Sequence, residues 1–128
     1  MTASRLVIPD LAGKTVLITG SSTGIGAAVA RGFAEQRSRV AVGYHSSADQ
    51  AHALVSEIKA AGGEALAVKG DVADPKACAQ IVADTTSRFG RLDGLINNAG
   101  LVLGRVHSLE ASDEHVQAAI DLNARSII

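Results

Sequence analysis

The chain has 128 residues, of which 47% are hydrophobic, 20% charged and 2% aromatic, and this composition is typical of one globular domain with an aliphatic core. Its 12 basic and 13 acidic residues give a formal net charge of −1 and form no Lys/Arg cluster, which argues against a nucleic-acid partner. The apolar patch at residues 6–8 is too short for a secretory signal or a membrane helix, so no membrane association is predicted.

Short apolar runs alternate with amphipathic segments along the chain. The runs are rich in β-branched residues and predict buried strands, whereas apolar residues at three- and four-residue spacing predict helices. In chain order, strands are predicted at residues 15–19, 39–44, 65–68 and 92–96, and helices at residues 24–36 and 48–61, from residue 75 and from residue 113.

The predicted helices carry apolar faces that are expected to pack on the strands. Asp74 and Pro75 open the third helix, and Ser112 caps the last one. The expected inward faces are Ile25, Val29 and Phe33; Ala51, Leu54, Val55 and Ile58; Cys78, Ile81, Val82, Thr85 and Phe89; and Val116, Ile120, Asn123 and Ile127.

This order of elements predicts an α/β fold. Strands that lack polar alternation are buried on both faces, so the sheet is predicted to be parallel, with helices above and below it. The connections are short and no linker interrupts them, so residues 1–128 are predicted to form a single domain.

A glycine-rich turn follows the first predicted strand. A diphosphate needs bare backbone N–H groups at a helix N-terminus, and glycines allow it to approach them. Gly20 is predicted to make the tight turn, Gly24 the close approach to phosphate, and Gly26 the tight packing of helix on strand. The alternative is a turn that caps a helix and binds nothing. The predicted cradle comprises Gly20, Ser21, Ser22, Thr23, Gly24, Ile25 and Gly26, with the three hydroxyls as donors to phosphate or ribose.

Two further motifs follow this turn in order, and a typical lead-in precedes it. The pattern Thr-Gly-x-x-x-Gly-Ile-Gly at residues 19–26, Asp71-Val72 and Asn-Asn-Ala-Gly at residues 97–100 together resemble the short-chain dehydrogenase/reductase family, as does the lead-in at residues 10–14. The resemblance implies a Rossmann-like three-layer α/β/α fold with strand order 3-2-1-4. It also implies an NAD(P)-dependent oxidoreductase that transfers a hydride between nicotinamide and an alcohol or carbonyl.

The resemblance carries roles for particular residues. Asp71 and Val72 are expected to contact adenine, although a strand-end turn aspartate is the alternative. The amides of Asn97 and Asn98 are expected to tie neighbouring loops together. The implied cofactor contacts also include Asn98, Ala99 and Gly100, of which the last two leave room for the adenosine ribose, and Asn123 is the implied helix asparagine of a proton relay.

The end of the second strand bears on the choice of cofactor. An acidic side chain there bonds the ribose 2′-hydroxyl of NAD and repels a 2′-phosphate. Here the chain reads Tyr44, His45, Ser46 and Ser47, without an acid, which favours NADP over NAD as the bound dinucleotide. Thr23 argues the other way, because NADP-preferring relatives often carry Arg or Lys at that position.

The catalytic groups that the family requires are absent from the 128 residues. The one tyrosine, Tyr44, is followed four residues later by Ala48, so no Tyr-x-x-x-Lys pair occurs, and no strand carrying the catalytic Ser follows. The chain is therefore interpreted as an N-terminal cofactor-binding fragment, inactive by itself. In the full-length protein, an alcohol or carbonyl substrate and a homo-oligomer are expected. The strand at 92–96 is expected to be an unprotected apolar edge.

Two alternatives remain open. One is a non-catalytic dinucleotide-binding or interaction module whose open sheet edge is its partner surface, and the other is a Rossmann-like nucleotide binder of the methyltransferase kind. No metal site is predicted, because His52, His107 and His115 lack ligand spacing. The single cysteine, Cys78, is predicted to pack in the core, and with no other address in the sequence a cytoplasmic location is expected.

Overall fold

A computed structural model describes residues 6–128. Within this part, strands and helices alternate along the chain, framed by short 3-10 turns at Pro9–Leu11 and Arg125–Ile127. The elements are β1 (Thr15–Ile18), α1 (Gly24–Glu35), β2 (Arg39–Tyr44), α2 (Ala48–Ala60), β3 (Glu64–Lys69), α3 (Pro75–Phe89), β4 (Gly94–Ile96) and α4 (Asp113–Asn123).

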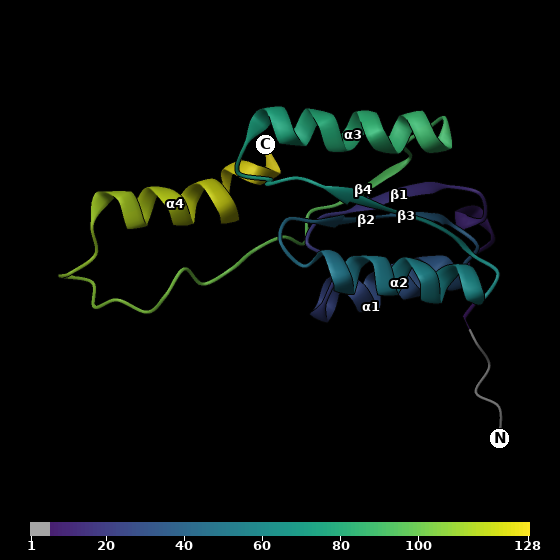
Figure 1. Cartoon of the computed structure of the whole chain (residues 1–128), viewed down its shortest axis with the longest axis horizontal. Coiled ribbons are helices and arrows are strands. Elements are labelled where there is room, and N and C mark those ends of the chain that lie inside the picture. Colours follow the sequence, from purple (N-terminus) through teal and green to yellow (C-terminus); the bar gives the residue numbers. More distant parts are fainter. Residues whose placement is uncertain (1–5) are drawn as a thin grey trace, which may run out of the picture.

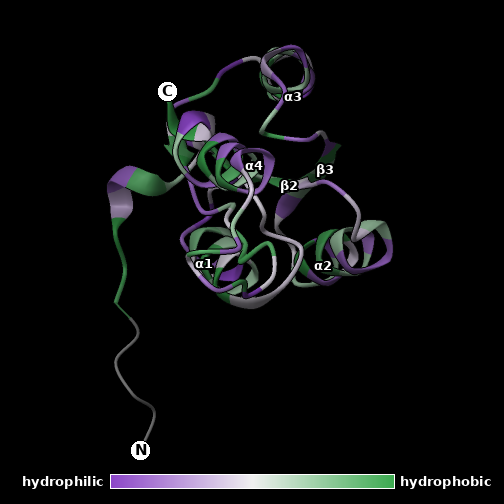
Figure 2. Ribbon diagram, turned by 90° about the vertical axis from the view of Figure 1, so that its left-hand side faces the viewer, coloured by the Kyte–Doolittle hydropathy of each residue, from purple (hydrophilic) through white to green (hydrophobic). Residues whose placement is uncertain are grey.

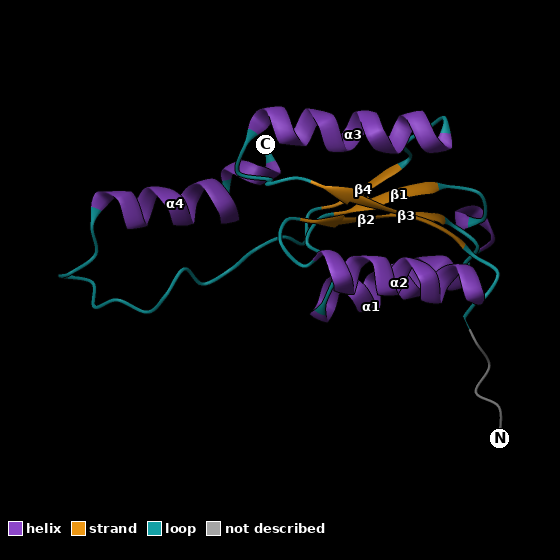
Figure 3. Ribbon diagram, in the orientation of Figure 1, coloured by secondary structure: helices purple, strands orange, loops and turns teal. Residues whose placement is uncertain are grey.

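The four strands, orange in Figure 3, form one parallel sheet. Their order is β3-β2-β1-β4, which confirms the predicted order. In the centre of the sheet, Val16 of β1 lies beside Val40 of β2 on one side and Gly94 of β4 on the other. All parallel strands end at the same edge, and the loops that follow β1, β2 and β4 therefore meet there. Most of the predicted cofactor residues lie on these loops or at the element ends beside them, whereas Asp71 and Val72 follow β3 and Asn123 is the last residue of α4.

Helices cover both faces of the sheet, so the predicted three layers are confirmed. Helices α1 and α2 lie side by side on one face and α3 lies on the other (Figures 1 and 2). The strands β1 and β2 are buried along nearly their whole length. The larger core cluster lies between the sheet and the α1–α2 layer and consists of Val16, Ile18, Ala27, Ala30, Val40, Val42, Ala51, Leu54, Val55, Ile58 and Ala65.

On α1 and on α3, one residue of the predicted apolar face points away from the core. Ile25 is 79% exposed, while Val29 and Phe33 of the same helix pack against the core. Ile25 lies in the first turn of α1. On α3, Val82 is 40% exposed, because the buried stripe runs through Ile81 and its neighbours at four-residue spacing instead.

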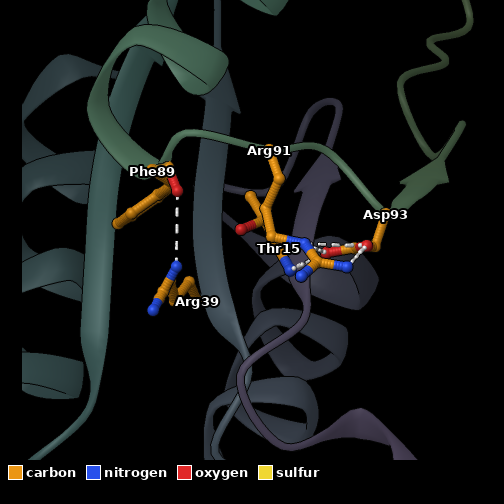
Figure 4. Close-up of polar contacts among 5 residues, drawn as sticks. All are labelled: Thr15, Arg39, Phe89, Arg91 and Asp93. Carbon is orange, nitrogen blue, oxygen red and sulfur yellow. Dashed lines mark hydrogen bonds and ion pairs between the residues drawn. The ribbon is translucent and has the colours of Figure 1, made fainter.

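The strand β4 is shorter than the predicted 92–96. Thr15 N–H donates to the Asp93 carboxylate at 2.8 Å, and Asp93 N–H donates to the Thr15 carbonyl at 2.9 Å (Figure 4). The Asp93 side chain thus takes the place of a backbone acceptor at the start of the β1–β4 pairing. Regular strand geometry begins only at Gly94.

The last helix departs most from the prediction. Its expected inward face is exposed, with Val116 at 46%, Ile120 at 45% and Ile127 at 55%, and no residue of α4 is buried. A long connection after β4 carries α4 away from the sheet (Figure 3). Of the helix, only its C-terminal end, at Leu122 and Asn123, reaches the loops at the edge of the sheet.

The edge strand β4 behaves as expected. It pairs only with β1, and Leu95 is 49% exposed, so this sheet edge is an open apolar one in the described part of the chain. Within residues 6–128, none of the helices combines the length and the hydropathy needed to cross a bilayer.

Candidate functional site

The turn between β1 and α1 depends on glycine in two different ways. Gly20 has φ +60° and Gly24 has φ +59°, a left-handed conformation that favours glycine. A Cβ on Gly20 would lie 2.8 Å from the Cα of Ala99, whereas a Cβ on Gly24 would meet nothing within 4 Å. Gly20 therefore makes the predicted tight turn against the loop after β4, and the backbone at Gly24 faces open space where a ligand can approach.

Gly26 is required by close packing. A Cβ at this position would collide with the side-chain amide of Asn98 and lie 2.7 Å from the carbonyl oxygen of Gly20. Gly26 is tightly packed, as predicted, but its neighbours are the glycine turn and Asn98 and not the strand.

Thr19 and Asn98 tie the glycine turn to the loop after β4. The Thr19 hydroxyl oxygen accepts hydrogen bonds from the backbone N–H groups of Asn98 at 3.1 Å and Ala99 at 3.0 Å. In return, the Asn98 amide donates to the carbonyls of Thr19 at 3.1 Å and Gly20 at 2.9 Å. The expected tie between loops is thus made by Asn98, while Asn97 is exposed.

The three hydroxyls of the turn do not behave alike. The Ser21 side chain is fully buried and its hydroxyl donates to the Ile18 carbonyl at 2.8 Å. The Ser21 hydroxyl was predicted to donate to phosphate or ribose, but its hydrogen is already used in this bond. The prediction is corrected: the Ser21 hydroxyl stabilises the turn itself. Ser22 is half-buried and Thr23 is exposed, and both remain accessible from the carboxyl edge of the sheet.

The helices differ in how their first N–H groups are satisfied. Asp74 caps α3 by accepting from Lys76 N–H at 2.9 Å, and Ser112 caps α4 by accepting from His115 N–H at 3.1 Å. Thr23 before α1 and Ser47 before α2 make no such side-chain bond. An anion at the carboxyl edge therefore meets uncapped amide donors and the positive end of the helix dipole.

A small cavity of about 70 Å³ opens beside the turn and gathers residues from several loops. Asp71 uses Oδ1 to accept from Ala73 N–H at 2.9 Å, an Asx turn that fixes the carboxylate beside this cavity. Of the predicted cofactor residues, the cavity is lined by Gly20, Tyr44, His45, Asp71, Val72 and Ala99.

The segment after β2 is polar and exposed where it leaves the sheet. The Tyr44 ring contacts the His52 ring edge-to-face at 6.0 Å between centroids, which orients the tyrosine toward α2. His45 and Ser46 follow as exposed residues, and the first acidic residue after β2 is Asp49 in the first turn of α2.

Gly100 and Asn123 contact each other instead of leaving space. A Cβ on Gly100 would lie 2.9 Å from Asn123 Oδ1, so the room expected there for ribose is occupied by this amide. Asn123 Oδ1 accepts from Leu101 N–H at 2.9 Å, and its Nδ2 donates to the Leu101 carbonyl at 3.0 Å. The side chain, expected on an inward face, is exposed and fastens the end of α4 to the loop after β4.

The residues that line this cavity but were not predicted as site residues are Thr19, Gly43, Gly70, Ile81 and Leu122. Thr19 belongs to the glycine motif, and its position there was the available signal. Gly43 accepts from Ser21 N–H at 2.8 Å, and a Cβ on it would lie 2.8 Å from the Ile18 carbonyl; a glycine inside an apolar strand signals such an approach. Leu122 lines the cavity from α4, and no local pattern indicates that.

A larger hollow of about 510 Å³ lies at the opposite edge of the sheet, where β2 and β3 begin. The ion pair between Arg31 and Glu57, 2.7 Å long, forms part of its wall, and none of the predicted cofactor residues line it. Cys78 is half-buried, and burial together with the Asp74 carboxylate raises the pKa of its thiol. No cluster of three potential metal ligands occurs among residues 6–128.

Comparison with known proteins places the chain in a family. The family model described as short chain dehydrogenase matches residues 14–128. The L-rhamnose 1-dehydrogenase (NAD(P)(+)) of Sphingomonas sp. strain SKA58 is 50% identical over 91 residues, which cover 71% of this chain and 36% of that protein. The 3-oxoacyl-[acyl-carrier-protein] reductase of Synechocystis sp. is 40% identical over 91% of this chain and 47% of that protein.

Solved structures agree with this placement. A short chain dehydrogenase from Burkholderia cenocepacia J2315, solved in complex with NADP, superposes with a TM-score of 0.86 and 38% identity over 91% of this chain and 47% of that one. The NADH-dependent reductase A1-R′, complexed with NAD, gives 0.87 and 34% identity over 93% of this chain and 49% of that one. The chain thus spans about half the length of its relatives or less. Its matched residues, glycine turn and sheet order together show that it belongs to the short-chain dehydrogenase family.

Proposed function

We propose that this chain is the cofactor-binding part of an NAD(P)-dependent oxidoreductase that transfers a hydride between nicotinamide and an alcohol or carbonyl. The bound cofactor supplies the hydride acceptor or donor. Residues 1–128, as a single dinucleotide-binding domain, hold its adenosine and diphosphate. The non-catalytic module is not favoured, because the relatives named above are dehydrogenases and reductases.

One observation carries this proposal: the glycine turn is held open at the carboxyl edge of the sheet. Gly24 has free space around its Cα, and the α1 N-terminus behind it is uncapped by Thr23. The bonds from Asn98 to Thr19 and Gly20 keep the turn in place without a ligand. A preorganised row of amide donors of this kind suits a diphosphate, since little ordering is needed on binding.

We further propose that NADP(H) is the preferred cofactor. No acidic side chain follows β2 before Asp49, so nothing at this point repels a 2′-phosphate. His45 and Ser46 are exposed beside the cavity edge, and Ser47 leaves its hydroxyl uncommitted to the helix cap. Asp71 remains the proposed acceptor for the adenine amino group.

The proposed hydride transfer requires a general acid/base and a cationic neighbour, and the 128 residues do not include this pair. The sequence contains no Tyr-x-x-x-Lys pair, so the general acid/base and its cationic neighbour are proposed to lie in the remainder of a longer protein. Asn123 is proposed to contribute to proton relay there. In the described structure its amide is engaged with Leu101.

Paired glycine substitutions test the proposed function. Gly26→Ala places a methyl group against Asn98 and the Gly20 carbonyl, and overpacking of this kind costs about 1–3 kcal/mol. We expect NADP⁺ affinity, measured by calorimetry, to fall by about tenfold or more. Gly32→Ala is the matched control: nothing lies within 4 Å of its Cβ, and alanine should stabilise α1 by about 0.5–1 kcal/mol.

Equal affinity of the Gly26→Ala and Gly32→Ala variants for NADP⁺ would contradict the proposed cradle. The same preparations should show no NADPH oxidation with carbonyl compounds. Turnover by the 128-residue chain alone would show that the catalytic groups are not where we propose.

A further inference from the structure

The last two residues of β2 connect the glycine turn to the loop that carries Asp71. The Gly43 carbonyl accepts from Ser21 N–H at 2.8 Å, on the side of β1. The Tyr44 carbonyl accepts from Gly70 N–H at 2.9 Å, on the side of β3 and directly before Asp71. Adjacent residues of one strand thus hold both loops, because successive carbonyls point to opposite neighbours.

Resting on the proposed function, we propose that Ser21 and Gly43 are positioning residues that set the spacing between the diphosphate subsite and the adenosine subsite. The Ser21 side chain is buried and Gly43 has none, so neither contacts the ligand through a side chain. A dinucleotide occupies both subsites at once, and the second contact adds affinity only where the spacing of the sites matches the ligand. Wrong spacing therefore weakens binding of the joined ligand and not of its separate parts.

The approach of β2 to the turn leaves no room for a side chain. A Cβ on Gly43 would lie 2.8 Å from the Ile18 carbonyl oxygen and 3.2 Å from the Thr19 Cα, so the backbone would have to shift. The same Ile18 oxygen accepts from the Ser21 hydroxyl at 2.8 Å. Ser21 therefore bridges the gap between the two strands, with its N–H bonded to β2 and its hydroxyl bonded to β1.

Each of the two loops is fixed within itself. The Asn98 amide donates to the carbonyls of Thr19 and Gly20 and holds the turn. On the other side, the Asp71 carboxylate is held by Ala73 N–H. A displacement at β2 therefore changes the distance between the loops more than the shape of either one.

The test compares Gly43→Ala with Gly94→Ala. Both replace a strand glycine, but a Cβ on Gly94 meets only the Val16 side chain, at an ordinary contact distance of 3.6 Å. Dissociation constants of NADP⁺, adenosine and inorganic pyrophosphate are measured by NMR titration. Gly43→Ala should lose about tenfold in NADP⁺ affinity and keep the wild-type affinities for adenosine and pyrophosphate. Gly94→Ala should keep all three affinities.

A loss of stability gives a different pattern. A partly unfolded variant binds every ligand less well by the same factor. Equal losses for NADP⁺, adenosine and pyrophosphate in Gly43→Ala would overturn this inference, and so would an NADP⁺ affinity equal to that of Gly94→Ala. Wild type that binds none of the three ligands would overturn the proposed function as well.

Ser21→Ala is the second variant, because it removes one hydroxyl and introduces no clash. It keeps the N–H bond to Gly43 but frees the Ile18 carbonyl, so NADP⁺ affinity should fall about threefold, with adenosine and pyrophosphate unchanged. Ser38→Ala is the matched control: this buried serine donates to the Leu11 carbonyl, also at 2.8 Å, at the opposite edge of the sheet. It should keep the wild-type NADP⁺ affinity, and equal losses in the two serine variants would contradict the inference.

Discussion

At the scale of single residues, Asn98 shows how much one side chain can organise. Its amide nitrogen has two hydrogens, and it donates to the carbonyls of Thr19 and Gly20. Its backbone N–H is in turn held by the Thr19 hydroxyl. Two loops almost 80 residues apart in sequence, at separations of 78 and 79, are joined by these bonds. The carbonyl oxygens of Thr19 and Gly20 can only accept hydrogen bonds, so the side chain at position 98 must be a donor.

Replacing the amide by a carboxylate should break the connection. Asn98→Asp has nearly the same shape, but it points an acceptor at two carbonyl oxygens and leaves them without a donor. We expect a loss of about 1–3 kcal/mol in the free energy of unfolding, measured with urea.

The control for Asn98→Asp is the same substitution at its neighbour, Asn97, which is exposed. Asn97→Asp should change the urea midpoint little, because surface substitutions are usually within about 0.5 kcal/mol of neutral. Similar losses in both variants would mean that the added charge, not the lost donor, is responsible.

At the scale of elements, the start of β4 is set by side chains. Arg91 holds the Asp93 carboxylate with its Nε at 2.8 Å, and Thr15 N–H bonds the same carboxylate (Figure 4). Beside them, Arg39 Nη1 donates to the Phe89 carbonyl at 3.3 Å and ties β2 to the end of α3. The β1–β4 pairing thus begins at an ion pair.

This arrangement predicts an acid sensitivity. The Arg91 guanidinium and then the Thr15 N–H lower the pKa of the Asp93 carboxyl. Its folded pKa lies below the unfolded value of about 3.9, so its contribution is full above about pH 4 and is lost as the pH falls through the folded pKa. Asp93→Asn should be less stable than wild type at neutral pH, and the difference should shrink in acid.

Urea unfolding at neutral pH and near pH 3 measures this shrinkage. Asp84→Asn, an exposed carboxylate on α3 that bonds Gln80, controls for the loss of one negative charge. A constant difference between Asp93→Asn and wild type at both pH values would refute the linkage.

At the scale of the whole molecule, stability is unevenly distributed. The buried residues of β1, β2 and α2 form the larger core cluster, and α3 packs Ile81 against the other face. Helix α4 makes its main contacts with the short turn at Arg125–Ile127 and buries none of its own residues. The sheet and its first three helices should therefore unfold as a unit without α4.

Hydrogen exchange should resolve these two parts. Amides of β1 and β2 should exchange only through global unfolding, whereas those of α4 should exchange through local opening at rates close to those of an unfolded chain. Helix α3, which is 15 residues long against 11 in α4 and packs on the sheet, is the internal comparison. Protection of α4 equal to that of α3 would show that α4 has a packing surface after all.

The amino-acid sequence by itself determined the strands and the glycine turn. Apolar runs without alternation made buried parallel strands, and the glycines at 20, 24 and 26 made a tight turn with an open backbone at Gly24, because these properties depend on side-chain size and backbone freedom near in sequence. The family motifs also indicated the strand order, which the sheet confirms.

Tertiary structure alone decided which way particular side chains face. Ser21 turned inward to the Ile18 carbonyl, Ile25 stayed in solvent, and Asn123 filled the space beside Gly100. A periodic pattern shows that a helix has an apolar face, but not whether a partner surface lies within reach. For α4 the long connection after β4 places that face beyond the sheet, and packing distance, not periodicity, determines burial.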